Sequence, residues 1–267
     1  MSDYDLLDTE SGNALVAAID HGLSLGATEG FYDPEATLRA VLDGGPDAVL
    51  VGPHFARRYG DVIAEAGADV VVTADIVTDS TRPGFDDGQD VWTPAFDPDL
   101  LLDIDPMGVK IVLVFGRDDR EMFVRNLSYV AEMAEALRGT GVPLVVEPVM
   151  WGSRVPAELE THPEYVARAA RMAWEYGADI LKLPYTGDVE TFEPIVEHSP
   201  VPVMILGGPK SGTTASMLSN VEGAIDSGAR GIMIGRSIWK TGDPTSVVSA
   251  LDGIIHGGQS VDDVWDA

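Results

Sequence analysis

The sequence predicts an α/β fold of the (β/α)8 barrel type, and three observations support this class. Short, uninterrupted apolar runs alternate with amphipathic segments of helical spacing along the chain. Such strands are typical of a parallel sheet covered by helices on both faces. The alternation gives eight strands, which fits the roughly 250 residues of a barrel better than an open doubly wound sheet. Because no linker or composition shift divides residues 1–267, we expect a single domain.

The predicted elements follow one another in a regular order. Strands are expected at residues 14–19, 48–51, 68–72, 109–115, 143–149, 178–182, 201–206 and 231–234. Helices are expected at 34–43, 119–138, 162–176, 188–198, 214–227 and 244–255. A repeated phrase, in which a helix ends at glycine and a short strand follows, occurs at Gly45, Gly67, Gly177 and Gly228. Glycine is the usual residue just past a helix C-terminus, so the phrase indicates repeated helix-to-strand units.

Residues 76–106 interrupt this order with a segment rich in Asp, Pro and Gly. It is longer than an ordinary strand-to-helix loop, and it carries the aromatic residues Phe85, Trp92 and Phe96. We therefore expect an extended loop here. It would serve either as a lid or as part of a subunit interface, and we favour the interface.

The composition limits the classes of function. The chain has 44 acidic and 17 basic residues and a formal net charge of −27, which argues against nucleic acid and anionic membranes as partners. An acid-rich, lysine-poor surface is expected of a protein that works in high salt, where screening removes self-repulsion. No apolar run approaches the ~20 residues of a membrane span. With no cysteine and no signal-peptide pattern, we expect a cytoplasmic protein.

Lys182 stands near the end of an apolar run that is predicted to be a buried strand. Lysine is almost never fully buried without a partner, because desolvation disfavours its charge. Burial lowers the pKa of such an amine and leaves part of it neutral, as a nucleophile for carbonyl groups. The alternative is a strand-end lysine that only pairs with a carboxylate. Only four lysines occur in the chain, which makes this one more informative.

Two glycine-rich turns follow the seventh and eighth predicted strands. Gly207, Gly208 and Lys210 belong to the first, and Gly235 and Arg236 belong to the second. In barrels these two loops commonly bind phosphate through backbone N–H groups at a helix N-terminus. Arginine can add a bidentate contact. The alternative is that the glycines only form tight turns, but two such loops with an arginine at these strands favour phosphate.

The remaining polar residues at predicted strand ends supply candidates for acid and base chemistry. Asp20 follows the first strand and Glu147 lies in the fifth, and either could instead be a structural partner of Lys182. His21 and His54 lack the spacing of metal ligands. We therefore expect neither a metal nor another cofactor.

Together these residues resemble the archaeal-type class I (Schiff-base) aldolases, the DhnA/DeoC-like fructose-bisphosphate aldolase family. The similarity spans nearly the whole chain, and its most specific part is the Lys182 to Asp188 block, Lys-Leu-Pro-Tyr-Thr-Gly-Asp. The resemblance implies that Lys182 forms the Schiff base and that Asp20 is a nearby carboxylate. It implies a phosphorylated sugar or ketose as substrate, held by the glycine-rich turns, Arg236, His21 and Lys210. It also implies a homo-oligomer, such as an octamer or decamer.

The chain departs from the family in one respect. The family has a proton-transferring tyrosine after the fifth strand, in a Tyr-Pro-Arg-Gly context, whereas this chain has Trp151 nearby and an arginine, Arg154, that matches the family arginine. Either Glu147, Asp20 or Tyr185 takes the role, or the reaction differs.

Several functions therefore stay open. They are fructose-bisphosphate aldolase of glycolysis and gluconeogenesis, the transaldolase-like 2-amino-3,7-dideoxy-threo-hept-6-ulosonate synthase, and a thiolase for phosphorylated autoinducer-2. A catalytically silent barrel that binds a phosphometabolite is the alternative of another class. Retention of Lys182 in a lysine-poor chain argues against that last alternative.

Overall fold

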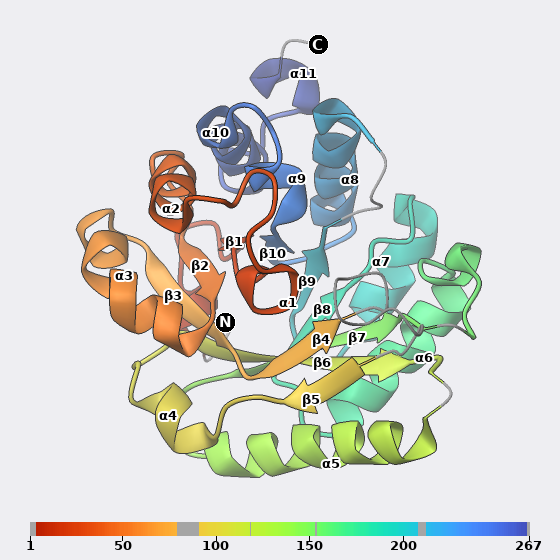
Figure 1. The fold of residues 1–267 in the computed structure, drawn as a ribbon. Helices are drawn as coiled ribbons and strands as arrows, with labels where there is room; N and C mark the ends of the chain where they lie inside the picture. Colours follow the sequence, from red (N-terminus) through yellow and green to blue (C-terminus); the bar gives the residue numbers. More distant parts are fainter. Residues whose placement is uncertain (1–3, 79–90, 118, 153, 208–211, 266–267) are drawn as a thin grey trace.

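The structure is a computed structural model. It describes residues 4–78, 91–117, 119–152, 154–207 and 212–265. Eight of its strands are β1 Ala14–Ala18, β2 Ala48–Val51, β3 Asp69–Thr73, β6 Gly108–Phe115, β7 Leu144–Met150, β8 Ile180–Leu183, β9 Val203–Leu206 and β10 Gly231–Ile234. They close into a parallel barrel in the order β1-β10-β9-β8-β7-β6-β3-β2 (Figure 1). The predicted (β/α)8 barrel is confirmed.

Alternate residues of each strand face the interior of the barrel, as the two-residue period of a strand requires. Apolar side chains with this orientation form one buried cluster that includes Val16, Leu50, Val71, Val145, Ile180, Met204 and Met233. Leu6 and Leu7, from the short helix η1 Asp5–Leu7, join the same cluster. Further along the strands the interior positions become polar, so the strand alternation itself carries polar side chains to the C-terminal end of the barrel.

Helices surround the barrel and bury a second, larger apolar cluster against its outer face (Figure 1). The longer helices are α2 Pro34–Leu42, α3 Pro53–Glu65, α5 Arg120–Leu137, α6 Pro163–Glu175, α7 Val189–Glu197, α8 Thr214–Asp226 and α10 Pro244–Ile255. The short ones are α1 Gly22–Leu25, α4 Pro98–Leu102, η2 Ala157–Leu159, α9 Arg236–Trp239 and α11 Val261–Val264. No range was predicted for α3, although the repeated phrase at Gly67 indicates a helix that ends there.

Side chains cap the N-termini of six helices by accepting a hydrogen bond from the amide three residues on. The capping residues are Asp33, Asp97, Asp119, Asp188, Thr213 and Asp243. Capping by aspartate satisfies an otherwise orphaned N–H and places negative charge at the positive end of the helix. Part of the acidic excess therefore stabilises helix ends.

The segment 76–106 corrects the prediction of an extended loop. In its described part, β4 Asp75–Thr78 pairs antiparallel with β5 Val91–Pro94 to form a hairpin, and α4 follows. The hairpin packs against α5, where the rings of Trp92 and Tyr129 lie 5.8 Å apart. The Tyr129 hydroxyl donates to the carbonyl oxygens of Ala74 and Phe96 at 3.1 and 2.7 Å. Phe85 lies outside the described residues.

Aspartates of the repeated helix-to-strand phrase bind backbone amides at the N-terminal end of the barrel. Asp47 Oδ2 accepts from the N–H of Leu15 at 2.6 Å, and Asp179 Oδ2 accepts from the N–H of Leu144 at 2.9 Å. His256 Nε2 lies 3.0 Å from the same oxygen of Asp47. Each of these two aspartates thus fixes the start of the preceding β-strand in the chain.

The first and last strands meet at a tight seam. Ala14 of β1 pairs with Gly231 of β10. A Cβ at Gly231 would lie 1.9 Å from the Ala14 carbonyl oxygen, and its φ is +119°, so only glycine fits there. Beyond the seam, the buried Trp239 donates from Nε1 to the Ala18 carbonyl oxygen at 3.2 Å. This bond ties α9 to β1.

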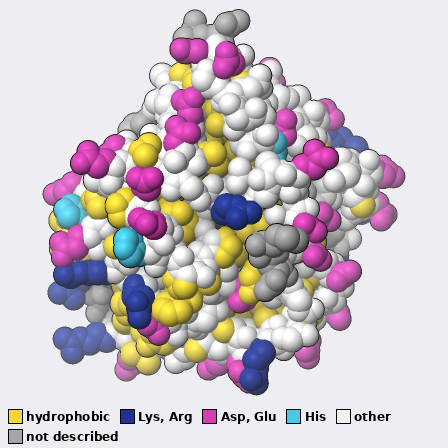
Figure 2. Space-filling view, turned by 180° about the vertical axis from the view of Figure 1, so that it is seen from behind, with side chains coloured by type: hydrophobic (Ala, Val, Ile, Leu, Met, Phe, Trp, Pro, Cys, Tyr) yellow, Lys and Arg dark blue, Asp and Glu magenta, His cyan; other side chains and the backbone are white. Residues whose placement is uncertain are grey.

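The surface is dominated by acidic side chains. Figure 2 shows them spread over the face opposite to that of Figure 1, whereas basic side chains are fewer. Several arginines on helices pair with carboxylates, as Arg39 does with Glu35 at 2.8 Å and Arg168 with Glu164 at 2.6 Å. Among the described residues, no helix combines the length and apolar character needed to cross a bilayer.

Candidate active site

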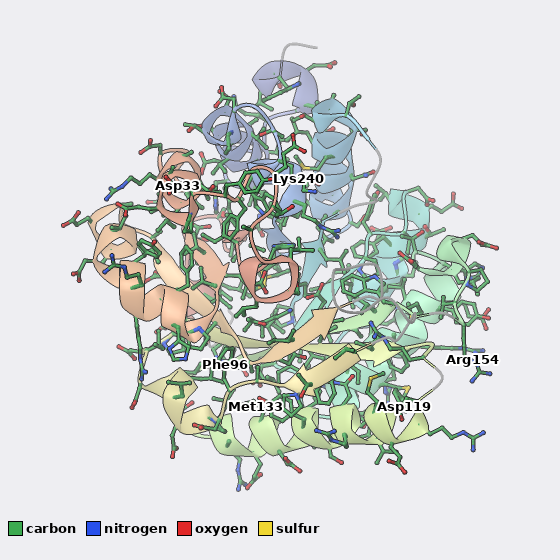
Figure 3. The ribbon with its side chains drawn as sticks, viewed as in Figure 1. Asp33, Phe96, Asp119, Met133, Arg154 and Lys240 are labelled. Atoms are coloured by element: carbon green, nitrogen blue, oxygen red, sulfur yellow. The ribbon has the colours of Figure 1, made fainter. Side chains whose placement is uncertain are left out.

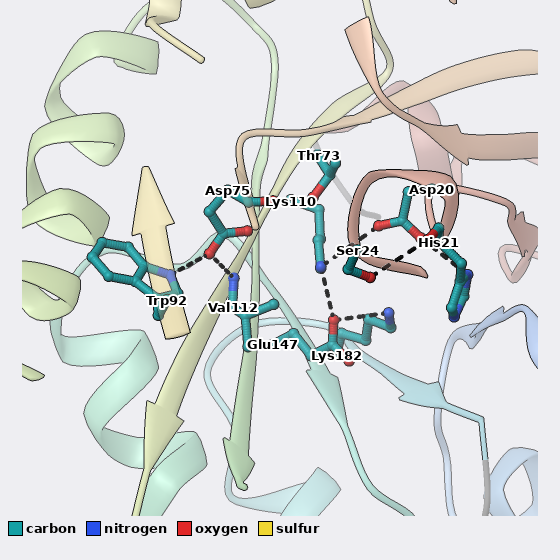
Figure 4. A network of polar contacts seen from close by, with 10 residues as sticks. All are labelled: Asp20, His21, Ser24, Thr73, Asp75, Trp92, Lys110, Val112, Glu147 and Lys182. Carbon is teal, nitrogen blue, oxygen red and sulfur yellow. Dashed lines mark hydrogen bonds and ion pairs between the residues drawn. The ribbon is translucent and has the colours of Figure 1, made fainter. Parts of the chain in front are cut away.

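Four charged side chains meet at the C-terminal end of the barrel (Figure 4). Lys182 Nζ on β8 donates to Oε2 of Glu147 on β7 at 2.9 Å. Lys110 Nζ on β6 lies 3.2 Å from the same oxygen and 3.8 Å from Oδ2 of Asp20, which follows β1. Both lysines and Glu147 are buried. The site is therefore a compact network of two amines and two carboxylates, contributed by four strands.

The strand alternation explains how these side chains come together. Lys182 follows the interior residue Ile180 by two positions, and Glu147 follows Val145 in the same way. Lys110 pairs in register with Val145 across β6 and β7, so it occupies an interior position where the neighbouring strand places an apolar side chain. Lys110, Glu147 and Lys182 thus lie at interior positions of their strands, and the closed sheet brings them close to Asp20, which follows β1.

The two lysines differ in their electrostatic surroundings. Burial disfavours the Lys110 ammonium, but Glu147, Asp20 and Asp75 outweigh this effect and raise its pKa. Burial lowers the pKa of Lys182; Glu147 opposes this shift, while the Lys110 ammonium adds to it. Lys110 therefore holds its positive charge, whereas Lys182 gives up its proton more easily than an ordinary lysine.

Glu147 stays ionised between the lysines. Burial alone would raise the pKa of its carboxyl group, but the ammonium groups of Lys182 and Lys110 lower the pKa to about 2. In the free protein Glu147 is thus a carboxylate. It can accept a proton once one of the two neighbouring ammonium groups loses its positive charge. A lysine amine near a carboxylate in a buried site can form an imine with a carbonyl compound.

His21 lies beside this network as a neutral imidazole. Burial lowers its pKa to about 4; the nearby Asp20 opposes the shift, and the charges of Arg236, Lys182 and Lys110 add to it. Its Nδ1 lies 3.4 Å from Oδ1 of Asp20. At neutral pH the ring can thus hydrogen-bond to a ligand without adding a charge.

Asp75 connects the network to the β4–β5 hairpin (Figure 4). Its Oδ2 accepts from Trp92 Nε1 at 2.7 Å and from the N–H of Val112 at 2.9 Å. Burial raises the pKa of Asp75 to about 6, against the opposing charge of Lys110. The hairpin is thus anchored on the strand that carries Lys110.

A pocket of about 400 Å³ opens beside Lys182. The predicted site residues that line it are His21, Glu147, Lys182, Gly207, Gly235 and Arg236. Gly208 and Lys210 lie outside the described residues. The structure therefore places most of the expected catalytic and phosphate-binding residues around one cavity. Asp20 does not line it, but is connected to the lining residue Glu147 through Lys110.

Two predicted site residues lie elsewhere. The Tyr185 ring packs edge-on against Phe192 at 5.1 Å, and its hydroxyl points at Gly223 on the outer helix α8. Arg154 lines a separate pocket of about 530 Å³ together with Arg117 and Phe123. Figure 3 shows Arg154 at the edge of the molecule, far from Lys240. The structure brings neither residue to Lys182.

Sequence reasoning missed Lys110. It lies inside the apolar strand 109–115, and the argument that singled out Lys182 applies to it equally. Its place on an interior position of that strand is the signal that was available. Trp151, which the sequence analysis noted near the place of the family tyrosine, also lines the pocket. Lys240 lines it too and was not singled out.

A closed barrel that holds a buried amine of lowered pKa beside a carboxylate belongs to the class of Schiff-base-forming barrel enzymes. The family described as DeoC/LacD family aldolase matches residues 14–241. The chain belongs to this family and is a class I aldolase, an aldehyde-lyase.

Named relatives agree with this assignment. The chain is 32% identical to a 2-amino-3,7-dideoxy-D-threo-hept-6-ulosonate synthase of Halobacterium salinarum, over 91% of this chain and 86% of the relative. It is 30% identical to a class 1 fructose-bisphosphate aldolase of Thermoproteus tenax, over 94% and 92%. An archaeal fructose-1,6-bisphosphate aldolase, solved with its catalytic lysine bound to a carbinolamine intermediate, superposes with a TM-score of 0.81 at 29% identity, over 94% and 97%.

Proposed function

We propose that the protein is a class I aldolase that cleaves or forms a carbon–carbon bond in a phosphorylated ketose, with Lys182 as the Schiff-base lysine. Fructose 1,6-bisphosphate is the first substrate to test. The observation that carries the proposal is that two buried lysines contact the same carboxylate, Glu147, and have pKa values shifted in opposite directions. Burial gives Lys182 the lowered pKa that a nucleophilic amine needs, and the positive charge of Lys110 adds to this shift.

The proposed reaction begins with attack of the neutral Lys182 amine on the ketone carbon. The carbinolamine loses water and becomes an iminium ion. A base then removes the proton of the hydroxyl group on the carbon that becomes the aldehyde. As the carbon–carbon bond breaks, its electron pair flows into the iminium and yields an enamine. Protonation of the enamine carbon and addition of water release the second product and restore the amine.

Glu147 or Asp20 is the proposed proton carrier. Glu147 contacts Lys182 directly, and Asp20 lies one residue away through Lys110. Tyr185, the third sequence candidate, faces α8 instead and is not proposed for this role. Lys110, held as an ammonium, would stabilise the negative charge that develops on the substrate oxygen atoms.

Borohydride trapping tests the proposal directly. The protein is incubated with fructose 1,6-bisphosphate or dihydroxyacetone phosphate, reduced with sodium borohydride, digested and analysed by mass spectrometry. We expect the adduct mass on the peptide that contains Lys182. Lys110 serves as an internal control, because it is equally buried but remains protonated. An adduct on Lys110, or no adduct with any sugar phosphate, would contradict the proposal.

A transaldolase-type synthase is the second candidate. The 32% identity to the Halobacterium salinarum synthase favours it, as does the absence of the expected tyrosine after the fifth strand. The two candidates share the imine and differ in the acceptor. If an adduct forms from fructose 1,6-bisphosphate but free glyceraldehyde 3-phosphate and dihydroxyacetone phosphate do not accumulate together, the transfer reaction is favoured.

We also propose a setting for this activity. The net charge of −27 supports work in high salt, and a sugar-phosphate substrate supports a cytoplasmic place in carbohydrate metabolism. The family resemblance supports a homo-oligomer, whereas Trp92 of the β4–β5 hairpin is buried against α5 and does not mark an interface. Light scattering over a salt series tests both points, because screening should stabilise the assembly as the salt concentration rises.

A further inference from the structure

The pocket beside Lys182 continues past Arg236 along helix α9. Arg236 begins α9, and Lys240 follows its last residue. Both line the pocket, together with Asn220 and Thr241. Residues four apart on a helix lie on one face, about 6 Å apart along the axis. The pocket therefore offers two positive side chains, one helical turn apart.

Neither cation has a carboxylate partner among the described residues. Arginines on the outer helices pair with carboxylates, such as Arg39 with Glu35 and Arg171 with Glu175. In contrast, Arg236 and Lys240 form no ion pair with any carboxylate in the part of the chain that the structure describes. In a chain with 44 acidic residues, two unpaired cations lining one cavity indicate an anionic ligand.

The position of Lys240 is set by its neighbour. Its ammonium nitrogen lies 5.7 Å from the ring centroid of Trp239. That tryptophan is buried and hydrogen-bonded to the Ala18 carbonyl oxygen. Figure 3 shows Lys240 beside α9. The hydrogen bond of Trp239 thus fixes the backbone next to Lys240 to β1. The Lys240 side chain is exposed and lines the pocket, where a ligand can contact it.

We propose that Lys240 adds a second positive contact, beside the expected contact from Arg236, and that the substrate phosphate therefore binds as a dianion. This inference rests on the proposed function and extends it to a residue that lies outside the glycine-rich turns. Arginine offers a planar pair of donors and lysine a point charge, so together they match the two charges of a phosphate monoester. The phosphate would then lie on the α9 side of Lys182, and a substrate with a single negative charge at that end would bind more weakly.

We call the pair Arg236 and Lys240 the phosphate clamp. Calorimetric titration with inorganic phosphate tests this clamp without catalysis. The unaltered protein, Lys240→Gln and Arg236→Gln are compared at pH 8 and at one fixed potassium chloride concentration. We expect each variant to bind about tenfold more weakly, the size of a lost charge-assisted hydrogen bond. At pH 5.5, where phosphate is a monoanion, Lys240→Gln should lose less affinity than at pH 8. Lys240→Arg should retain most of the binding, and Arg39→Gln is the control for a change of net charge.

Three results would overturn the clamp: no binding of phosphate to the unaltered protein, equal binding by Lys240→Gln, or an equal loss in Arg39→Gln. These results are separable from the Schiff-base proposal, because trapping on Lys182 does not depend on Lys240. If phosphate binding weakens as expected while no adduct forms on Lys182, the clamp stands and the proposed chemistry falls.

Discussion

The two ends of the barrel use acidic side chains in opposite ways. At the N-terminal end, Asp47 and Asp179 accept hydrogen bonds from backbone amides and fix the starts of strands. At the C-terminal end, Glu147 and Asp20 face lysine side chains in a buried pocket. A carboxylate that holds backbone in place contributes to stability, whereas one that shifts the pKa of an amine contributes to reactivity. Mutations at the two ends should therefore separate activity from stability.

The largest effect is expected from Lys182→Arg. A guanidinium cannot form the imine, so turnover should fall on the order of 10⁴-fold or more, as for loss of other catalytic nucleophiles. The melting temperature should change little, because a positive charge stays beside Glu147. Steady-state kinetics and thermal unfolding at high salt measure both quantities. Substantial remaining activity would show that another residue is the nucleophile.

Lys110→Met should change the pH dependence of the reaction. Burial lowers the pKa of Lys182 and the Lys110 charge lowers it further, so removal of that charge should raise the pKa. The acid limb of the pH profile of kcat/KM, which reports groups of the free enzyme, should then move up by about one pH unit. Lys110→Arg keeps the charge and should leave the limb nearly in place. A downward shift in Lys110→Met would contradict the assigned roles.

Asp47→Ala tests the role of acidic side chains at the N-terminal end of the barrel. It leaves the N–H of Leu15 without its acceptor, so the free energy of unfolding should fall by about 1–3 kcal/mol. kcat and KM should stay unchanged, because the site lies at the other end of the strands. Chemical denaturation measures the loss. Asp61→Ala, which removes an exposed aspartate of α3, is the matched control for the change in net charge.

The smallest effect is expected from His256→Gln and depends on pH. The hydrogen bond to Asp47 raises the pKa of His256 above its ordinary value, against the effect of burial. The pairing thus stabilises the fold fully below the unfolded pKa of about 6.5 and is lost as pH rises through the folded pKa. Because the pair is partly exposed, the difference from the unaltered protein should stay under about 1 kcal/mol. Urea unfolding at pH 5.5 and 8.5 should show the larger difference at pH 5.5.

The alternation of apolar and amphipathic segments was sufficient to predict the barrel. Eight buried strands of this kind leave few other ways to cover a parallel sheet. The hairpin β4–β5 was not predicted, because its strands lie in a polar segment whose pairing depends on packing against α5. Local pattern cannot report such tertiary contacts.

The sequence predicted which residues share the pocket where strand ends set their position. Lys182, Glu147 and Arg236 line one pocket, as expected from the rule that function lies at the C-terminal ends of barrel strands. Tyr185 and Arg154 were misplaced because they come after a strand end, in loops whose direction the strand period does not determine. Lys110 was missed although its strand was predicted correctly. The strand alternation, which decides whether a residue points into or out of the barrel, was not applied to Lys110.

The seam between β1 and β10 has a consequence for how the chain folds as it is synthesised. The hydrogen bond from Trp239 to Ala18 joins residues 221 positions apart. The barrel therefore cannot close against β1 until β10 and α9 have left the ribosome. Until then β1 keeps one edge without its final partner, and an exposed strand edge invites pairing with other chains. Contacts of such long sequence separation also slow folding. A ribosome-bound chain that ends before Gly231 should therefore be more prone to aggregate than one that extends beyond Trp239.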